Sequence, residues 1–561
     1  MTHAPQPRIL SRLGSTLEAL AHPSPPAFLL GALCFAAALT PSLIPRAGLL
    51  QGLLAGASFA AGYLVGAIGL LLWRMLHLPE PRPEQARIPA RVIGVIGIGV
   101  MLWALANASA WQQELHQTMG LPQVESARPL TIGLTALITA LVLVLLGRLF
   151  RTSTVVLARR LTPWMPDRLA MLTGFALVLA AFSIIGNDVL LRFGLNALDR
   201  SYRAVDQALP SLNHLPMPDD PLRSGSSESL MRWKDLGAEG RARVVDPLDR
   251  HIIADITGSP AMEPLRIYVG LGSAETPEER AQLALAEAIR TGAFERETMV
   301  ITTPTGTGWM DPAAMVPLEV LTGGNVATIA VQYSYLPSWL ALLTVPEYGV
   351  ETARATFVAI HQHWAGLPEA KRPKLYLFGL SLGSMNSDLS ADMFDIIAAP
   401  YQGALWVGPP FTSRSWKQIT AGRHPDSPAW LPRFRDGSVV RFMNQDGMPD
   451  ANLPWGPMRI VYLQYASDPI VFFSPSILWR EPDWMKTPRG PGVIESFRWI
   501  PLVTFLQTGF DVMTATTTPK GHGHVYDARD YTLAWIELLG PLSWSGEVMR
   551  KLHAYLDQRN L

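Results

Sequence analysis

Five long apolar segments crowd roughly the first 190 residues, and they constrain the fold of this chain more than any other feature. Each is about long enough to cross a bilayer core of roughly 30 Å, and such a segment must be helical because lipid offers its backbone no hydrogen-bond partner. A buried helical core of a soluble protein is the alternative, but five successive runs would need far more covering protein. We predict membrane spans at 27–43, 49–73, 92–108, 130–146 and 169–191.

The arginines between these segments indicate an orientation. If the spans alternate in direction, the short loops on one face of the membrane contain only Arg46 and Arg128, whereas those on the other face contain eleven arginines. Positively charged loops stay in the cytoplasm, so the N-terminus is expected there and everything after Leu191 on the opposite face. Pro41 and Pro45 interrupt the first segment, and a re-entrant first segment would reverse that conclusion. The arginine-rich side holds Arg8, Arg12, Arg74, Arg82, Arg87, Arg91, Arg148, Arg151, Arg159, Arg160 and Arg168.

Length and composition divide the chain further. A chain of 561 residues exceeds what one core usually organises, so at least two domains are expected. We predict a cytoplasmic tail at 1–26, an all-α membrane domain at 27–191, a Pro- and Ser-rich linker at 192–264 and a globular domain at 265–561.

Charge and cysteine content exclude several function classes. Lys+Arg and Asp+Glu both total 46, so the overall balance gives no reason to expect a nucleic-acid partner. The centres of the predicted spans carry no charge, which favours an anchor in the lipid bilayer over a transporter. The single cysteine, Cys34, excludes an intramolecular disulfide and a cysteine-based metal site.

The globular domain alternates strand-like apolar runs with helical patterns, which predicts a mostly parallel α/β sheet. One run, 374–378, leads directly into Gly379-Leu380-Ser381-Leu382-Gly383, and a segment that can be helical follows. This order of strand, Gly-x-Ser-x-Gly and helix is typical of a nucleophile elbow, with Ser381 at the tip of the turn. An ordinary glycine-flanked turn is the alternative, because the bare pattern arises by chance in chains of this composition.

The loop after an earlier predicted strand, 298–302, offers backbone amides for an oxyanion hole. It contains Thr305, Gly306 and Thr307 among small and glycine residues, so its N–H groups can approach a developing negative charge. The second donor is expected to be the backbone N–H of Leu382, directly after the nucleophile.

A catalytic serine needs a histidine as general base and an acid that orients the histidine, and in this type of sheet the chain order is serine, acid, histidine. Both residues are present in that order. Asp468 lies at the turn after a strand-like run, and a Gly-His-Gly-His loop precedes the last helical pattern. We favour His524 as the general base, and His522 remains the alternative. A metal site is not expected, because no carboxylate or cysteine cluster accompanies these histidines. Asp511 and Asp527 are the fallback candidates for the acid.

Six phrases of the sequence are distinctive when taken together: 40–46 (TPSLIPR), 303–309 (TPTGTGW), 332–339 (QYSYLPSW), 408–410 (GPP), 467–469 (SDP) and 521–526 (GHGHVY). They resemble the bacterial membrane-embedded α/β-hydrolase family, whose members carry their own N-terminal multi-span domain. The resemblance covers nearly the whole chain and implies an α/β-hydrolase fold. The chain departs from the family at Leu380, where an acidic residue is expected before the nucleophile.

These features predict a membrane-anchored serine hydrolase of the esterase or lipase type, without a cofactor. Ser381, His524 and Asp468 would cleave an ester or acyl bond of a lipid or envelope substrate by way of an acyl-enzyme. The expected location is the bacterial inner membrane, with the catalytic domain outside the cytoplasm. An envelope acyltransferase with the same triad and a non-catalytic scaffold are the alternatives, and the sequence does not indicate an oligomeric state.

Overall fold

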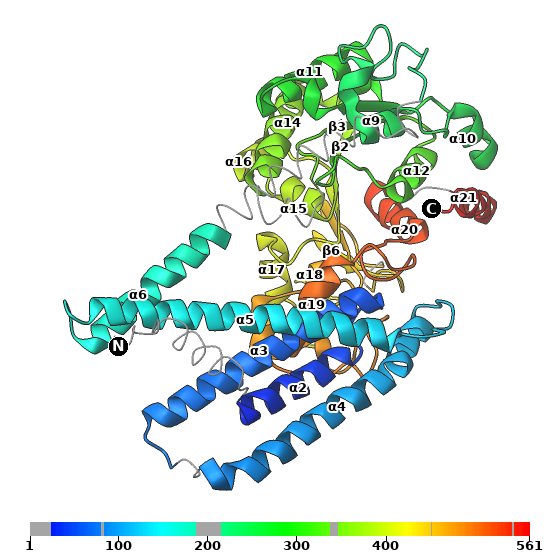
Figure 1. Cartoon of the computed structure of the whole chain (residues 1–561). Coiled ribbons are helices and arrows are strands. Elements are labelled where there is room, and N and C mark those ends of the chain that lie inside the picture. The colour runs from blue at the N-terminus through cyan, green and yellow to red at the C-terminus, as the bar shows by residue number, and fades with distance from the viewer. Residues whose placement is uncertain (1–23, 80–82, 187–214, 337–345, 450–451, 541–543) are drawn as a thin grey trace. The chain divides into compact units, whose positions relative to one another are not determined.

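The chain divides into two compact units, and each is described by itself (Figure 1). Unit 1 comprises residues 1–194, 475–481 and 494–514, and unit 2 comprises the remainder. Two pieces of the segment between Asp468 and His524 therefore belong to the same unit as the long apolar helices, and the predicted domain bounds remain a prediction. The computed structural model describes residues 24–79, 83–186, 215–336, 346–449, 452–540 and 544–561.

Among the described residues of unit 1, four helices are long and apolar enough to cross a membrane, where the sequence predicted five spans. The apolar windows lie in Gly48–Met75, Arg87–Thr118, Pro129–Leu161 and Asp167–Gly186. The helices of unit 1 are α2 (Pro25–Leu39), α3 (Gly48–Met75), α4 (Pro83–Thr118), α5 (Pro129–Leu161), α6 (Asp167–Ser183), η6 (Pro475–Leu478) and α19 (Val503–Met513).

The first predicted span is the one that falls short. Helix α2 has 15 residues and is therefore about 22 Å long, less than a bilayer core. It packs against α3 and α4, and Phe35 and Leu39 are buried in the core of this unit. A Cβ atom at Gly62 of α3 would lie 2.6 Å from Cys34 Sγ, so the two helices approach closely. Much of the apolar surface of α2 is thus buried against α3 and α4.

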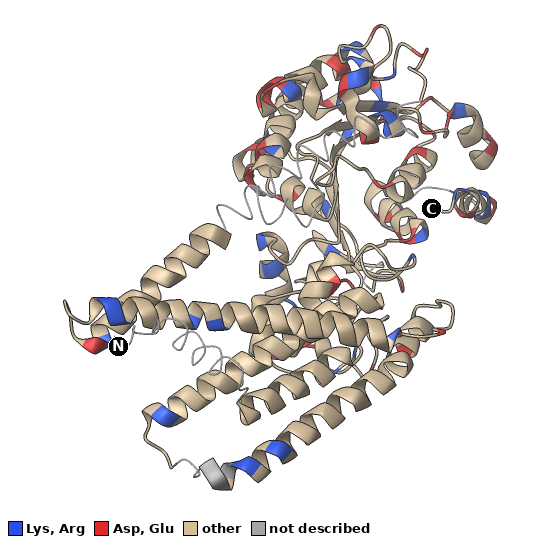
Figure 2. Ribbon diagram, viewed as in Figure 1, with Lys and Arg blue, Asp and Glu red and all other residues tan. Residues whose placement is uncertain are grey.

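The long helices of unit 1 carry few charged residues, as is expected of helices that cross a membrane. In Figure 2 the long helices are mostly uncharged, and Lys and Arg colour the end of α3, the first turns of α4 and the later part of α5. Helices α3 and α5 also pack tightly, because a Cβ at Gly56 would lie 2.5 Å from the Ala136 carbonyl oxygen. Small residues at such contacts are typical of helix association in lipid.

Unit 2 is built on a seven-stranded sheet in which every pairing is parallel, as the sequence predicted for its fold class. The order is β1-β3-β2-β4-β5-β7-β6, so β2 and β5 flank the strand that leads to Ser381. The strands are β1 (Leu265–Val269), β2 (Thr298–Thr303), β3 (Val326–Val331), β4 (Lys374–Leu380), β5 (Gly403–Val407), β6 (Val440–Met443) and β7 (Arg459–Leu463).

Helices connect and cover these strands, as crossovers between parallel strands require. The α-helices of unit 2 are α9 (Gly237–Val244), α10 (Arg250–Thr257), α11 (Pro277–Arg290), α12 (Pro312–Leu321), α14 (Pro346–Gly366), α15 (Leu382–Asp388), α16 (Met393–Ala398), α17 (Arg414–Ala421), α18 (Pro469–Phe472), α20 (Ala528–Leu539) and α21 (Gly546–Gln558). Short 3-10 helices are η2 (Trp233–Leu236), η3 (Leu271–Ser273), η4 (Ala293–Glu295), η5 (Glu369–Lys371) and η7 (Asp483–Met485).

The described part of the predicted linker contains helices η2, α9 and α10, which belong to unit 2, and α9 packs against β1. Arg243 of α9 forms an ion pair with Glu319 of α12 at 2.5 Å, and Arg266 of β1 binds the same carboxylate at 2.7 Å. These three side chains are almost fully buried, so α9 contributes to the core of unit 2.

Candidate active site

Ser381 occupies a sharp turn between β4 and α15. Its backbone has φ 59° and ψ −127°, a conformation that a non-glycine residue adopts only when the surrounding structure enforces it. A Cβ at Gly379 would lie 2.3 Å from the backbone of Gly383, and a Cβ at Gly383 would lie 2.2 Å from the Thr303 carbonyl oxygen. Both glycines are therefore needed for the turn to close against the end of β2.

Asp468 lies at the carboxyl end of the parallel sheet, in the turn after β7. It is fully buried, and its Oδ1 accepts a hydrogen bond from the Ile470 N–H at 2.9 Å, which caps α18. Its Oδ2 accepts two further hydrogen bonds, from His524 Nδ1 at 2.6 Å and from the Tyr526 hydroxyl at 2.7 Å. The carboxylate is thus held on both oxygens, with one of them directed at the imidazole.

The histidine loop, 515–526, is closed by its own backbone. The His524 N–H donates to the Ala515 carbonyl at 2.9 Å, and Thr518 Oγ1 donates to the His522 carbonyl at 2.6 Å. The Gly523 N–H donates to Ser467 Oγ at 3.0 Å, which ties this loop to the turn that carries the acid. The imidazole orientation is consequently fixed by several independent contacts.

The two histidines of this loop differ in their surroundings. With Nδ1–H donating to Asp468, His524 presents Nε2 as an acceptor, and this buried nitrogen has no hydrogen-bond partner within the described part of the chain. His522 Nδ1 lies 3.3 Å from the Lys520 carbonyl, and the hydrogen bonds to Asp468 Oδ2 come from His524 and Tyr526. Of the two histidines, His524 is thus the one that the buried carboxylate orients.

Ser381 and His524 both lie beside the end of β5. The Ser381 N–H donates to the Val407 carbonyl at 2.9 Å, and a Cβ on the next residue, Gly408, would lie 2.5 Å from His524 Cε1. Since no described residue hydrogen-bonds to His524 Nε2, Ser381 Oγ does not bind it in this structure. Such bonds are often long in enzymes without substrate and shorten when the substrate arrives.

The predicted oxyanion loop lies between β2 and α12. The Thr305 N–H donates to the Trp309 carbonyl at 3.0 Å, so this amide is engaged within the loop in this structure. The side chain of Gln332, which follows β3, also holds the loop, because Gln332 Nε2 donates to the Thr307 carbonyl at 2.9 Å. The oxyanion roles of Thr305, Gly306, Thr307 and Leu382 remain predictions.

Comparison with known families agrees with this geometry. A model described as "Alpha/beta-hydrolase family" matches residues 265–552, and one described as "Alpha/beta-hydrolase family N-terminus" matches residues 39–247. The chain belongs to the alpha/beta-hydrolase family. The family resemblance inferred from the sequence is thereby confirmed. No curated protein and no solved structure matched the chain in the corresponding comparisons.

Two buried side chains near these residues were not predicted as part of the site. Burial raises the pKa of Tyr526 well above its usual value, with the charge of Asp468 acting in the same direction, so the phenol keeps its proton and donates to Asp468. Burial raises the pKa of Asp311 to about 6, and its carboxylate accepts a hydrogen bond from the Tyr531 hydroxyl at 3.0 Å. Two sequence features could have pointed to these residues. Tyr526 ends the histidine-containing phrase GHGHVY, and Asp311 precedes a proline at the start of a helix.

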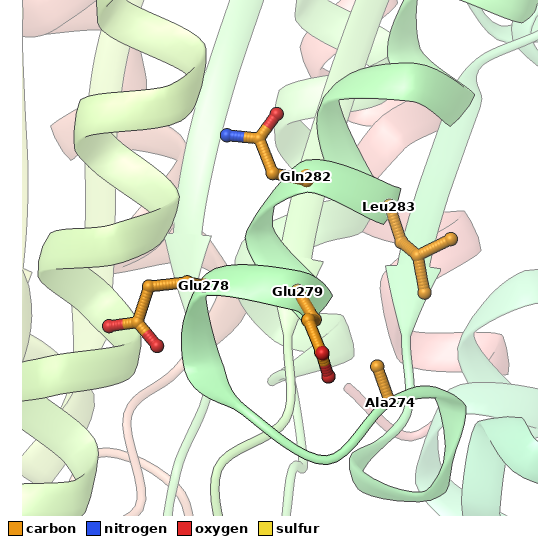
Figure 3. A pocket seen from close by; sticks show the side chains of 5 residues that line it. All are labelled: Ala274, Glu278, Glu279, Gln282 and Leu283. Carbon is orange, nitrogen blue, oxygen red and sulfur yellow. The ribbon is translucent and has the colours of Figure 1, made fainter.

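A surface pocket on the first turns of α11 lacks the side chains of a reaction centre. Figure 3 shows Glu278, Glu279 and Gln282 around it, together with Ala274 and Leu283. Glu279 has a structural role, because its carboxylate and the Thr276 side chain form a reciprocal cap at the start of α11. None of the predicted site residues lines this pocket, so we assign it no catalytic role.

Proposed function

We propose that this chain is a membrane-anchored serine hydrolase that cleaves an ester or acyl bond. The observation that carries the proposal is the 2.6 Å bond between His524 Nδ1 and Asp468 Oδ2, beside the strained turn that bears Ser381. A carboxylate that fixes an imidazole whose other nitrogen is free to accept a proton is the arrangement that activates a serine hydroxyl.

The reaction would proceed in two acyl-transfer steps. His524 Nε2 takes the proton of Ser381 as its Oγ attacks the substrate carbonyl, and Asp468 stabilises the imidazolium that forms. The backbone N–H of Leu382 and an amide of the 303–309 loop would stabilise the oxyanion. The protonated imidazole then returns its proton to the leaving alcohol, and water, activated by the same base, releases the acid and restores Ser381.

Labelling with a fluorophosphonate probe tests whether the site is an active serine hydrolase. We expect isolated membranes to show labelling of the full chain and complete loss of labelling in Ser381→Ala, since only an activated serine attacks phosphorus at a useful rate. Ser390→Ala is the matched control, because this buried hydroxyl donates only to the Ser387 carbonyl, at 2.7 Å. Folded wild-type protein that takes up no probe would instead favour a non-catalytic scaffold.

The proposed substrate is a lipid or envelope ester, and this rests on orientation. The connections α3–α4 and α5–α6 lie on the arginine-rich side, which the positive-inside rule places in the cytoplasm. Helix α6 starts from that side and, if it spans, ends on the other, so the catalytic segment emerges outside the cytoplasm. This argument starts from the arginine-rich connections and does not depend on α2. The count of spans from the N-terminus does depend on α2, which is why a re-entrant first segment would reverse the orientation derived from that count. Arg46 gives little topological signal, since Asp511 Oδ1 lies 2.7 Å from its Nη2.

Reporter fusions test this orientation. Alkaline phosphatase, which is active only outside the cytoplasm, should be active when fused after Leu561. The same reporter fused after Pro166, in the arginine-rich α5–α6 connection, should be produced but inactive. An inactive and stably produced fusion at Leu561 would place the catalytic unit in the cytoplasm and redirect the search to cytosolic esters and thioesters.

A further inference from the structure

Tyr531 of α20 is fully buried in unit 2, and it contacts three segments that carry the proposed reaction. Its hydroxyl donates to Asp311 Oδ2 at 3.0 Å. The centre of its ring lies 6.3 Å from that of Phe378, on the strand that leads to Ser381, and 6.2 Å from that of Tyr526. Both separations are those of packed aromatic pairs. One side chain therefore joins the nucleophile strand, the residue that follows the predicted oxyanion loop and the surroundings of the acid.

Asp311 connects this tyrosine to the predicted oxyanion loop, 303–309. It lies two positions after Trp309, whose carbonyl accepts the Thr305 N–H and closes the loop. Asp311 Oδ1 accepts the Ala313 N–H at 2.9 Å, which caps α12. The carboxylate thus fixes the point at which the loop ends and the helix begins.

The beginning of the same loop packs against the serine turn. A Cβ at Gly383 would lie 2.2 Å from the Thr303 carbonyl oxygen and 2.9 Å from that of Pro304. With its start held against this turn and its end held at Asp311, the loop has both ends fixed. A displacement at Asp311 would therefore change where the loop amides lie relative to Ser381.

The other side of Tyr531 faces the residue that supports the acid and the base. The Tyr526 hydroxyl donates to Asp468 Oδ2 at 2.7 Å, and the Tyr526 ring meets the His524 ring edge-on, with 5.7 Å between the ring centres. Since Tyr531 packs against Tyr526 and binds Asp311, it ties the predicted oxyanion loop to the acid–base pair.

Capping alone does not account for a carboxylate at position 311. A serine would cap α12 without placing a charge in the protein interior. Burial raises the pKa of Asp311 to about 6, as expected for a carboxyl group removed from water. What aspartate adds is a second oxygen, and that oxygen binds the Tyr531 hydroxyl.

We propose that Tyr531 and Asp311 are positioning residues, which hold the predicted oxyanion loop in a fixed place beside the acid–base pair. This inference rests on the proposed hydrolase function and extends it to two residues outside the triad. Donors to an oxyanion act only when they are placed in advance, and a displacement of about 1 Å is enough to weaken them.

The test is Tyr531→Phe in the full-length protein, purified in detergent and shown by circular dichroism and gel filtration to be folded. We expect kcat for a short p-nitrophenyl ester to fall about fivefold or more with KM unchanged, because the loop stabilises the transition state more than the bound ester. A trifluoromethyl ketone, which forms a tetrahedral oxyanion with Ser381, provides a second readout. Its inhibition constant should rise by the factor by which kcat/KM falls.

Tyr376→Phe is the matched control. The Tyr376 hydroxyl also binds α20, by donating to the Leu538 carbonyl at 3.4 Å, but Tyr376 lies near the beginning of β4 and Ser381 follows its end. This variant should leave both kcat and the inhibition constant unchanged. Equal losses in the two tyrosine variants would reveal a general effect of loosening α20 and would overturn the positioning role.

Two substitutions of Asp311 test the other partner of the bond. Asp311→Ser keeps the cap of α12 but is too short to bind Tyr531 as well, so it should reproduce the losses of Tyr531→Phe. Asp311→Asn can accept the Ala313 N–H and donate to the Tyr531 hydroxyl, so it should retain most of the activity. Wild-type kcat and inhibition constant in folded Tyr531→Phe or Asp311→Ser overturn the proposal. Failure of the hydrolase proposal is distinct, because then the wild type itself takes up no fluorophosphonate.

Discussion

Replacing His524 by alanine is expected to lower hydrolysis of a short p-nitrophenyl ester by about 10³-fold or more, as loss of a triad member does. The reason is geometric. His524 is the histidine that Asp468 orients, and its Nε2 is the unpaired buried nitrogen that can take the serine proton. Steady-state kinetics on detergent-solubilised protein, normalised to folded protein, measure the effect.

His522→Ala is the matched control from the same loop. His522 is partly exposed and its ring contacts a backbone carbonyl, while its own carbonyl accepts a bond that any residue could accept. This variant should therefore keep most of the activity. The reverse ranking, with His522→Ala inactive and His524→Ala active, would show that the base has been assigned to the wrong histidine.

Local sequence patterns predicted the parts of this fold that local patterns control. Apolar runs bounded by turn residues indicated β2, β4 and the strand before Asp468, β7, and the glycines around Ser381 marked the turn that the backbone adopts. Strand β6 was not among the predicted strands, and it contains Arg441. That guanidinium is buried and stacks 3.7 Å from the centre of the Trp455 ring, a partner that only the folded chain provides.

The other pairings depend on partners far away in the sequence. Arg243 lies in the segment predicted as a linker, and in the structure it pairs with Glu319 inside the core of unit 2. Asp511 was a fallback candidate for the acid, and in the structure it pairs with Arg46, more than 450 positions earlier in the chain. No periodicity or spacing indicates such pairings, so the partners of Arg243 and Asp511 could not be predicted from the sequence.

Replacing Asp468 by asparagine is expected to preserve folding and to lower kcat by about 10³- to 10⁴-fold. An amide is nearly the same size as the carboxylate, and its oxygen can still accept the Ile470 N–H that caps α18. What it cannot do is accept from both His524 Nδ1 and the Tyr526 hydroxyl with a full negative charge. The imidazole would lose its tautomeric preference and the partner that stabilises its protonated form.

Tyr526→Phe separates the contribution of the Tyr526–Asp468 hydrogen bond from that of the His524–Asp468 hydrogen bond. It removes one donor to Asp468 but leaves the bond between Asp468 and His524, so a loss of about tenfold in kcat is expected, which corresponds to one hydrogen bond to a charged group. Near-normal turnover in Asp468→Asn would require another carboxylate to serve the imidazole. Asp511 is held by Arg46, and Asp527 caps α20 through the Arg529 N–H at 2.8 Å, so each would have to abandon its partner. For this reason we expect the asparagine variant to be inactive rather than rescued.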